Sequence, residues 1–274
     1  MTGSHGAPLV DIGANLTNKA FRDDLDAVLA RAAAAGIEAI VVTGTSAQAS
    51  RAAHGIAAGR RAAGAGPTLH ATAGVHPHHA STLSPETLDE LRALLRLPEV
   101  VAVGECGLDY DRNFSPQDVQ RRAFEAQLEL AAEVSKPVFL HERDADADFT
   151  AILARWRPRL VGGVVHCFTG DRAALEAYLD LGMHVGITGW ICDERRGTHL
   201  KELVPLVPAG KLLVETDAPY ILPRDLPHRP RDGRNEPALL VHVARAVAAC
   251  RGETLEELAA HTTRAARELF ALPA

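Results

Sequence analysis

Eight short apolar segments recur along the chain, and longer stretches rich in alanine, leucine, arginine and glutamate separate them. Most of these segments are continuously apolar rather than alternating, which is typical of parallel strands buried on both faces. The predicted strands are Leu9–Ile12, Ala39–Thr43, Leu69–Val75, Val100–Gly104, Pro137–Leu140, Val161–Val165, His184–Ile187 and Lys211–Glu215.

The stretches between the predicted strands begin like helices. Ser84 and Ser115 each precede a proline, as N-capping serines do, and Thr254 with Glu257 has the spacing of a capping box. Strands that alternate with helices without a linker predict an α/β fold, a single (β/α)₈ TIM-type barrel that forms one domain over residues 1–274. An open doubly wound sheet is the alternative, but the segment after the first strand lacks the glycine-rich motif of a dinucleotide-binding fold.

Composition narrows the class of protein. Hydrophobic residues make up 47% of the chain, which excludes a disordered protein. Acidic residues (35) outnumber basic ones (29), and the net charge of −6 argues against a protein that is basic over its whole surface, although a local basic groove stays compatible with it. The four cysteines form no C-x-x-C pair, and residues 1–8 do not have the pattern of a signal peptide. We therefore expect a cytoplasmic monomer that does not bind membranes.

Polar residues with metal-binding side chains follow several predicted strands. Glu105, His141, His166 and Asp217 come at the ends of the fourth, fifth, sixth and eighth strands. The carboxyl ends of barrel strands meet at one mouth, so these side chains are expected to converge there. Two imidazoles and two carboxylates are typical ligands of a divalent cation, which can activate water or polarise a phosphate oxygen. The alternative for each residue alone is a structural role, such as an ion pair for Glu105 or a turn cap for Asp217.

Other residues near the predicted mouth are candidates for contact with a substrate. Arginines can bind successive phosphates of a strand, and an exposed aromatic ring can stack on a base. The structural alternative is a solvated loop for the arginines and packing between neighbouring loops for the aromatic rings. The candidates for substrate binding are Asn15, His76, His78, Arg143, Trp190, Arg229 and Arg231.

Eight segments, in order along almost the whole chain, resemble the TatD family of metal-dependent deoxyribonucleases, and most closely its TatD branch. They are Asp11–Thr17, Gly74–His78, Gly104–Tyr110, Pro137–Arg143, His166–Gly170, Gly186–Trp190, Glu215–Tyr220 and Arg234–Pro237. The resemblance implies a TIM-type barrel and a magnesium-dependent 3′→5′ exonuclease of single-stranded DNA or RNA, with a role in DNA repair or nucleic-acid turnover. It also implies metal ligation by Glu105, His141 and His166, with Asp217 as a further ligand or as the general base, so that Glu105 and Asp217 are the predicted catalytic residues.

Two observations bear on which metal binds and on how many ions bind. Two histidine ligands favour Mn²⁺, Zn²⁺ or Co²⁺, whereas the resemblance implies Mg²⁺. Many family members carry a His-x-His pair at the positions where this chain has Gly13 and Asn15. We therefore expect one complete metal site, and any second ion would be held mainly by substrate phosphate and water.

Two other functions are compatible with the same residues. The metal site would equally serve a deacylase of D-aminoacyl-tRNA or another ester or amide hydrolase, because the activated water is common to all of them. A nucleic-acid-binding protein without catalytic activity is the second alternative, which Gly13 and Asn15 favour and the four intact ligand residues disfavour.

Overall fold

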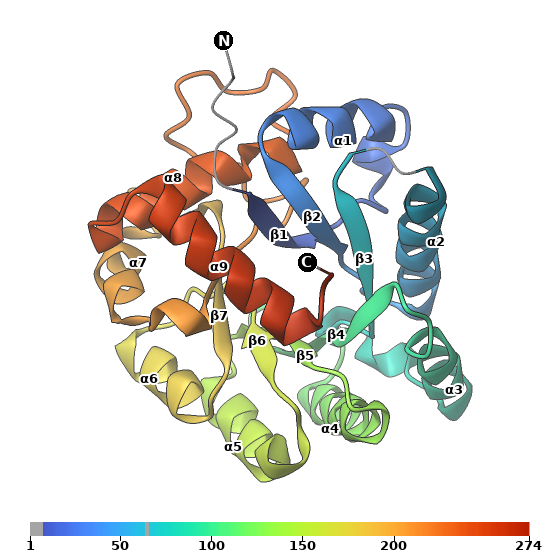
Figure 1. The fold of residues 1–274 in the computed structure, drawn as a ribbon. Coiled ribbons are helices and arrows are strands. Elements are labelled where there is room, and N and C mark those ends of the chain that lie inside the picture. Colours follow the sequence, from blue (N-terminus) through green and yellow to red (C-terminus); the bar gives the residue numbers. More distant parts are fainter. Residues whose placement is uncertain (1–7, 64–65, 274) are drawn as a thin grey trace.

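Eight parallel strands form the centre of the molecule, and helices surround them (Figure 1). The computed structural model describes residues 8–63 and 66–273, so the N-terminal segment for which no signal peptide is expected lies almost entirely outside the described residues. Neighbouring strands pair in sequence order, which confirms the predicted barrel. The strands are β1 (Leu9–Ala14), β2 (Ile37–Val42), β3 (Thr68–Ala73), β4 (Val100–Asp109), β5 (Val138–Arg143), β6 (Gly163–Val165), β7 (His184–Ile187) and β8 (Leu212–Val214).

Nearly every strand is followed by a helix that packs outside the barrel. The α-helices are α1 (Leu25–Ala34), α2 (Ala47–Ala63), α3 (Pro85–Leu94), α4 (Gln117–Val134), α5 (Asp146–Trp156), α6 (Arg172–Asp180), α7 (Thr198–Leu203), α8 (Leu240–Arg251) and α9 (Leu255–Phe270). Short 3₁₀ helices are η1 (Lys19–Phe21), η2 (Pro77–Thr82), η3 (Arg157–Arg159), η4 (Gly189–Cys192), η5 (Val204–Leu206), η6 (Ala209–Lys211) and η7 (Pro237–Leu239). Among the described residues, no helix combines the length and the apolar character needed to cross a membrane.

The barrel closes between β1 and the segment that follows β8. The backbone N–H of Asp217 donates to the carbonyl of Gly13 (2.8 Å), and that of Asn15 donates to the carbonyl of Ala218 (2.7 Å). These bonds bring the two ends of the sheet together beside the carboxyl ends of the strands. Residues from the first and last strands therefore lie next to each other there.

The interior of the barrel is packed with side chains, and α9 covers its amino-terminal end. Val10, Ile12, Phe139 and Leu213 form a buried cluster with residues of α9 such as Phe270. The hydroxyl of Thr263 on α9 also donates to the carbonyl of Pro8, just before β1 (2.7 Å). Because this end is sealed, the carboxyl ends of the strands are the open side of the barrel.

Two of the three predicted helix caps are confirmed. Ser84 caps α3 by accepting from the backbone N–H of Thr87, and Thr254 with Glu257 forms a capping box on α9. The prediction for Ser115 is wrong, because Pro116 is the N-cap of α4. The buried hydroxyl of Ser115 instead donates to the carbonyl of His78 (3.2 Å), so that it fixes η2 rather than the helix.

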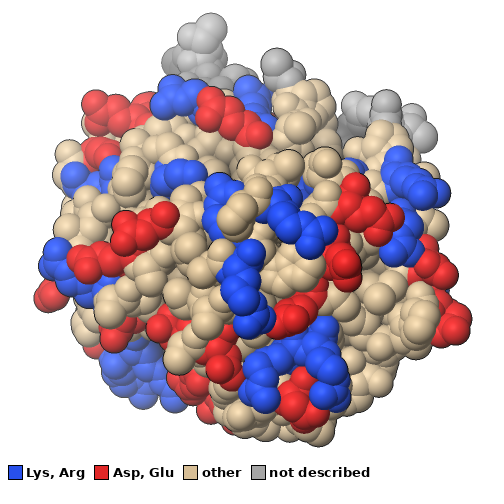
Figure 2. Space-filling model, turned by 90° about the horizontal axis from the view of Figure 1, so that it is seen from below, with Lys and Arg blue, Asp and Glu red and all other residues tan. Residues whose placement is uncertain are grey.

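Charged side chains of both signs are spread over the surface. On the face that Figure 2 shows, basic groups lie near the middle with acidic groups among and around them, and neither sign covers the whole face. This mixture agrees with the modest net charge of −6. Any attraction for a polyanion must therefore come from local groups of basic residues rather than from the field of the whole molecule.

Candidate metal centre

Glu105 is the centre of a cluster of imidazoles at the open end of the barrel. Its Oε1 atom lies 2.8 Å from His166 Nε2, 3.0 Å from His141 Nδ1 and 3.2 Å from His76 Nε2. Burial alone would raise the pKa of this carboxyl, but the nearby His166 and His76 and the hydrogen bonds from His141 and His166 hold it well below its ordinary value. Side chains that are far apart in sequence thus meet around one buried carboxylate.

Two glycines bring Glu105 to this position. Gly104 and Gly107 both have φ +143°, and a Cβ at these positions would lie 2.2 Å from the carbonyl oxygen of Phe139 and 1.9 Å from that of His141. Only glycine lets β4 approach β5 so closely in this conformation. As a result β4 continues to Asp109, so the prediction that this strand ends at Gly104 is wrong.

Asp109 is a functional candidate that the sequence analysis left without a role. Its Oδ2 atom lies 2.7 Å from His78 Nε2 and 3.5 Å from His141 Nε2. Burial opposes its ionisation, but the nearby His141 imidazole and hydrogen bonds from the backbone N–H of Arg112 and from His78 hold its pKa well below the ordinary value. This carboxylate therefore orients two imidazoles at once. The available signal was its position in the segment Gly104–Tyr110, at the end of a strand that was predicted too short.

Glu215 is a second residue without an assigned role. Its fully buried Oε2 atom lies 3.4 Å from His166 Nδ1, and its other oxygen accepts the backbone N–H of Cys167. Gly13 and Gly186 make room for it, because a Cβ at these positions would lie 2.4 Å and 2.6 Å from its carboxylate oxygens. The sequence feature that could have identified Glu215 is its position directly after an apolar strand.

Asp217 and Asn15 meet where the barrel closes. The Asn15 amide donates to Asp217 Oδ1 (2.8 Å). Burial, together with the nearby acids Glu105 and Glu215, raises the pKa of Asp217 to about 8 against the opposing influence of His166 and the hydrogen bond from Asn15. The fold thus brings the residue predicted after the eighth strand beside the residue predicted after the first.

A cavity of about 530 Å³ opens over this cluster. Among the residues lining it are all four predicted metal ligands and most of the predicted substrate contacts: Asn15, His76, His78, Glu105, His141, Arg143, His166, Trp190 and Asp217. Arg229 and Arg231 lie exposed on the segment after β8 and are not among the described residues that line it.

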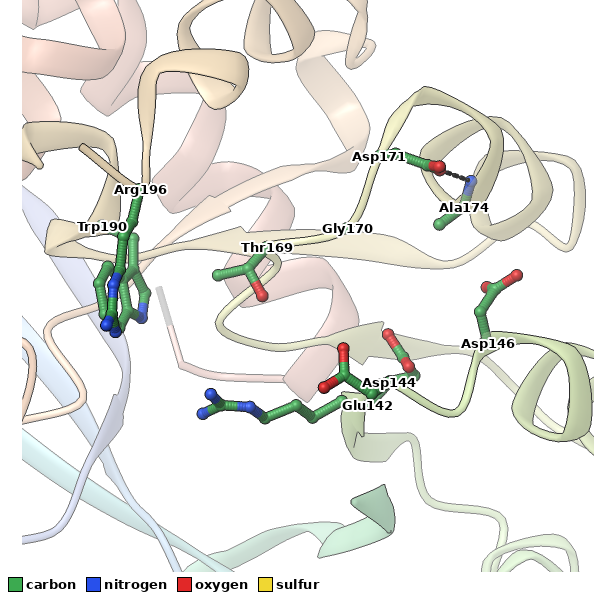
Figure 3. A pocket seen from close by; sticks show the side chains of 10 residues that line it. Glu142, Asp144, Asp146, Thr169, Gly170, Asp171, Ala174, Trp190 and Arg196 are labelled. Carbon is green, nitrogen blue, oxygen red and sulfur yellow. Dashed lines mark hydrogen bonds between the residues drawn. The ribbon is translucent and has the colours of Figure 1, made fainter. Parts of the chain in front are cut away.

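A second cavity, of about 430 Å³, adjoins the first and is lined in part by the same residues, among them Arg143 and Trp190. Figure 3 shows that Trp190 and Arg196 lie on one side of it, with the guanidinium of Arg196 5.8 Å from the Trp190 ring centroid. Acidic residues line the other side: Glu142, Asp144, Asp146 and Asp171. The second cavity therefore changes from basic and aromatic on one side to acidic on the other.

The residues at the cluster fit a divalent cation. One ligand atom each from His76, Glu105 and His141 lies within 4.8 Å of the others. His141 Nε2 is buried and makes no hydrogen bond with the described residues, although Asp109 Oδ2 lies 3.5 Å from it. Several nitrogen and oxygen donors that point at one another in a buried site are costly without a cation between them.

Comparison with known proteins agrees with this geometry. The sequence pattern of the TatD-related DNases matches residues 10–271. The chain belongs to the TatD family. It is 54% identical over 266 residues to the 3′-5′ ssDNA/RNA exonuclease TatD of Erwinia billingiae, a match that covers 97% of this chain and 100% of the relative.

Two further relatives extend the comparison. The exonuclease TatD of Salmonella typhimurium is 51% identical over 262 residues, which cover 96% of this chain and 98% of the relative. The crystal structure of a TatD homologue from Escherichia coli superposes with a TM-score of 0.88 at 29% identity and covers 97% of this chain and 99% of that one. The resemblance inferred from the eight sequence segments is thereby confirmed.

Proposed function

We propose that this chain is a metal-dependent hydrolase that removes nucleotides from the 3′ end of single-stranded DNA or RNA. The observation that supports the proposal most strongly is the contact of Glu105 with three imidazoles at the open end of the barrel. It occurs in a chain that is 54% identical to a protein described as a 3′-5′ ssDNA/RNA exonuclease.

The metal ligands in this proposal are Glu105, His141, His166 and Asp217, with His76 as an additional donor within reach of Glu105. We propose Mg²⁺ as the cation, since the two carboxylates and a substrate phosphate supply the oxygen ligands that it prefers. A cation bound there would lower the pKa of a water molecule and offset the negative charge that develops on the phosphate. Mn²⁺ is the substitute that the imidazoles favour.

The remaining residues of the cavity bind and orient the reactants. Besides binding the cation, Asp217 would accept the proton of the attacking water, because the positive charge of the cation would lower the raised pKa of this carboxyl. Asn15 fixes the carboxylate for this task by donating to its Oδ1 atom. His78, held by Asp109, and the guanidinium of Arg143 contact the oxygens of the scissile phosphate. In this proposal the proton acceptor and the phosphate contacts are residues that line one cavity.

The adjoining cavity supports removal of a terminal nucleotide rather than internal cleavage. A base that enters it can stack on Trp190, next to Arg196. Asp144, Asp146 and Asp171 on the far side would repel the phosphate of any further nucleotide. The cavity therefore accepts the last nucleoside of a strand but disfavours continuation of the strand beyond it.

The polarity of digestion can be tested with single strands labelled at the 5′ end. We expect a ladder of progressively shorter labelled products, loss of all cleavage with EDTA, and strong inhibition by an inverted nucleotide at the 3′ end. D-aminoacyl-tRNA serves as the competing substrate. Deacylation of that ester without shortening of the single strands would contradict the proposal and support the alternative hydrolase.

The role of Glu105 can be tested by the substitution Glu105→Gln. We expect kcat/KM to fall by more than about 100-fold, because even residues that support a metal ligand typically account for about 10–100-fold. Glu133→Gln, which neutralises an exposed carboxylate on α4, is the matched control and should leave the rate unchanged. Equal rates for Glu105→Gln and the wild type would remove this residue from the site.

A further inference from the structure

A second group of metal-binding side chains lies outside the catalytic cavity. It consists of Cys192 at the end of η4, Asp225 on the segment after β8, and His242 in the first turn of α8. One ligand atom from each lies within 4.8 Å of the others, and His242 Nε2 is 2.6 Å from Asp225 Oδ1. None of these residues lines the cavity above Glu105.

We propose that Cys192, Asp225 and His242 bind a Zn²⁺ ion that is separate from the catalytic metal. The donor set is one sulfur, one nitrogen and one oxygen, and sulfur selects Zn²⁺ over Mg²⁺. The catalytic cluster, by contrast, is built from imidazoles and carboxylates.

The environment of each residue suits this assignment. Cys192 is 2% exposed, so the sulfur is held in place, whereas the side chains of Asp225 and His242 are 48% and 25% exposed and leave a path for the ion and for a water ligand. Burial and the neighbouring Asp225 together raise the pKa of the Cys192 thiol to about 12, so a bound cation must displace the thiol proton. The positive charge of Lys201 on α7 acts in the opposite sense on this thiol and favours the thiolate.

The three ligands come from three separate parts of the chain, so the ion would cross-link them. Asp193, next to Cys192, already pairs with Arg224, next to Asp225 (2.8 Å). The cross-link would therefore strengthen an existing contact between η4, which carries Trp190, and the segment after β8, which carries Tyr220 and Ile221 into the catalytic cavity. Zn²⁺ at this position would stabilise one wall of that cavity without taking part in the reaction.

Cobalt provides a direct test, because a thiolate ligand gives Co²⁺ an intense charge-transfer absorption in the near ultraviolet that nitrogen and oxygen ligands do not give. We expect the metal-free, reduced protein to develop this band on titration with Co²⁺, to reach the intensity of one thiolate-bound Co²⁺ per chain, and to lose it when Zn²⁺ is added. Co²⁺ that binds at the catalytic cluster does not contribute to the band, because the proposed ligands there are nitrogen and oxygen. Cys192→Ser should abolish the band. Cys167→Ser, next to the catalytic cluster, and Cys250→Ser, on the same helix as His242, are the matched controls and should keep it.

Two further variants separate this site from the catalytic one and from misfolding. Glu105→Gln should keep the band, because the proposed site does not depend on the catalytic metal. His242→Gln changes a partly exposed residue, and it should weaken Co²⁺ binding at least tenfold while the unfolding temperature of the metal-free protein stays unchanged. Absence of the band from the wild type, its survival in Cys192→Ser, or its loss in Cys167→Ser would overturn the proposal.

Discussion

At the scale of single residues, Asp11 shows how the barrel closure depends on protonation. This fully buried carboxyl accepts hydrogen bonds from the hydroxyl (2.6 Å) and the backbone N–H (3.0 Å) of Thr216. Burial raises its pKa from 3.8 to about 7, although the hydrogen bonds from Thr216 and Gly13 oppose the increase. In the folded protein Asp11 therefore keeps a proton that the unfolded chain releases near pH 4.

The consequence is a predicted pH dependence of stability. Because the folded pKa of Asp11 is raised, its contribution to the free energy of unfolding is complete below about pH 4 and is lost as the pH rises through about 7. We expect Asp11→Asn to reduce the fall in unfolding temperature between pH 5 and 8, measured in EDTA so that metal binding does not contribute. Part of the dependence of unfolding temperature on pH should remain in this variant, because the pKa of Asp217 is also raised. Identical slopes for variant and wild type would contradict the assignment.

Trp190 allows a residue-scale test of base stacking. We expect Trp190→Ala to lower kcat/KM on single strands by about 5- to 150-fold, which corresponds to the roughly 1–3 kcal/mol that a stacked base contributes. The control is Trp156→Ala on α5, a change at the chain's other tryptophan, which packs under Arg159 away from both cavities. That variant should change stability but not kcat/KM. A Trp190→Ala enzyme with wild-type kinetics would exclude stacking on this ring.

At the scale of elements, strand and helix positions could be predicted where the pattern is local. The apolar runs located every strand, and Ser84 and Thr254 located two helix starts, because capping uses side chains a few residues apart. Ser115 has the same local pattern, but its hydroxyl donates to the carbonyl of His78 in η2. The two residues are 37 positions apart, so a rule based on neighbouring residues cannot predict this bond. The extension of β4 to Asp109 could not be predicted from the local pattern either, because it depends on how Gly104 and Gly107 pack against β5.

The glycines of β4 give a prediction for this element. We expect Gly107→Ala to destabilise the fold by more than about 2 kcal/mol, because alanine is strained at a positive φ and its Cβ would overlap the backbone of β5. Gly55→Ala is the opposite case: this glycine lies exposed in α2 with open space around it, and the change should stabilise the protein by up to about 1 kcal/mol. Chemical denaturation measures both. A tolerated Gly107→Ala would contradict the close approach of β4 and β5.

At the scale of the whole molecule, the barrel predicts which residues share its open end but not how each side chain points. Glu105, His141, His166 and Asp217 were predicted because each comes at the end of an apolar run. The structure has His166 and Asp217 after β6 and β8, whereas Glu105 and His141 lie within β4 and β5, which are longer than predicted. His76 and His78 follow β3 only two residues apart, yet His76 contacts Glu105 whereas His78 contacts Asp109. That difference comes from the turn at η2, where His76 Nδ1 accepts the backbone N–H of His78, and a strand pattern carries no information about it.

The charge distribution gives a prediction at this scale. On a protein with net charge −6, nucleic-acid affinity depends on local arginines, and Arg229 and Arg231 are exposed on the segment that leaves the catalytic cavity. We expect Arg229→Ala with Arg231→Ala to weaken binding of a single strand and to reduce the slope of log K against log salt by about 0.7 per arginine. Fluorescence anisotropy with Glu105→Gln protein measures this without cleavage. Arg155→Ala with Arg172→Ala, on the outer helices, should leave the slope unchanged.

The space that Glu215 occupies limits how this barrel can acquire a different set of ligands. Its Oε2 atom lies 2.4 Å from where a Cβ at position 13 would come, and the Phe139 ring lies 3.0 Å from the same point. A side chain at position 13 therefore requires Glu215 to turn its carboxylate, which now lies 3.4 Å from His166 Nδ1. A designer who adds an imidazole at position 13 thus also changes how this acid faces His166.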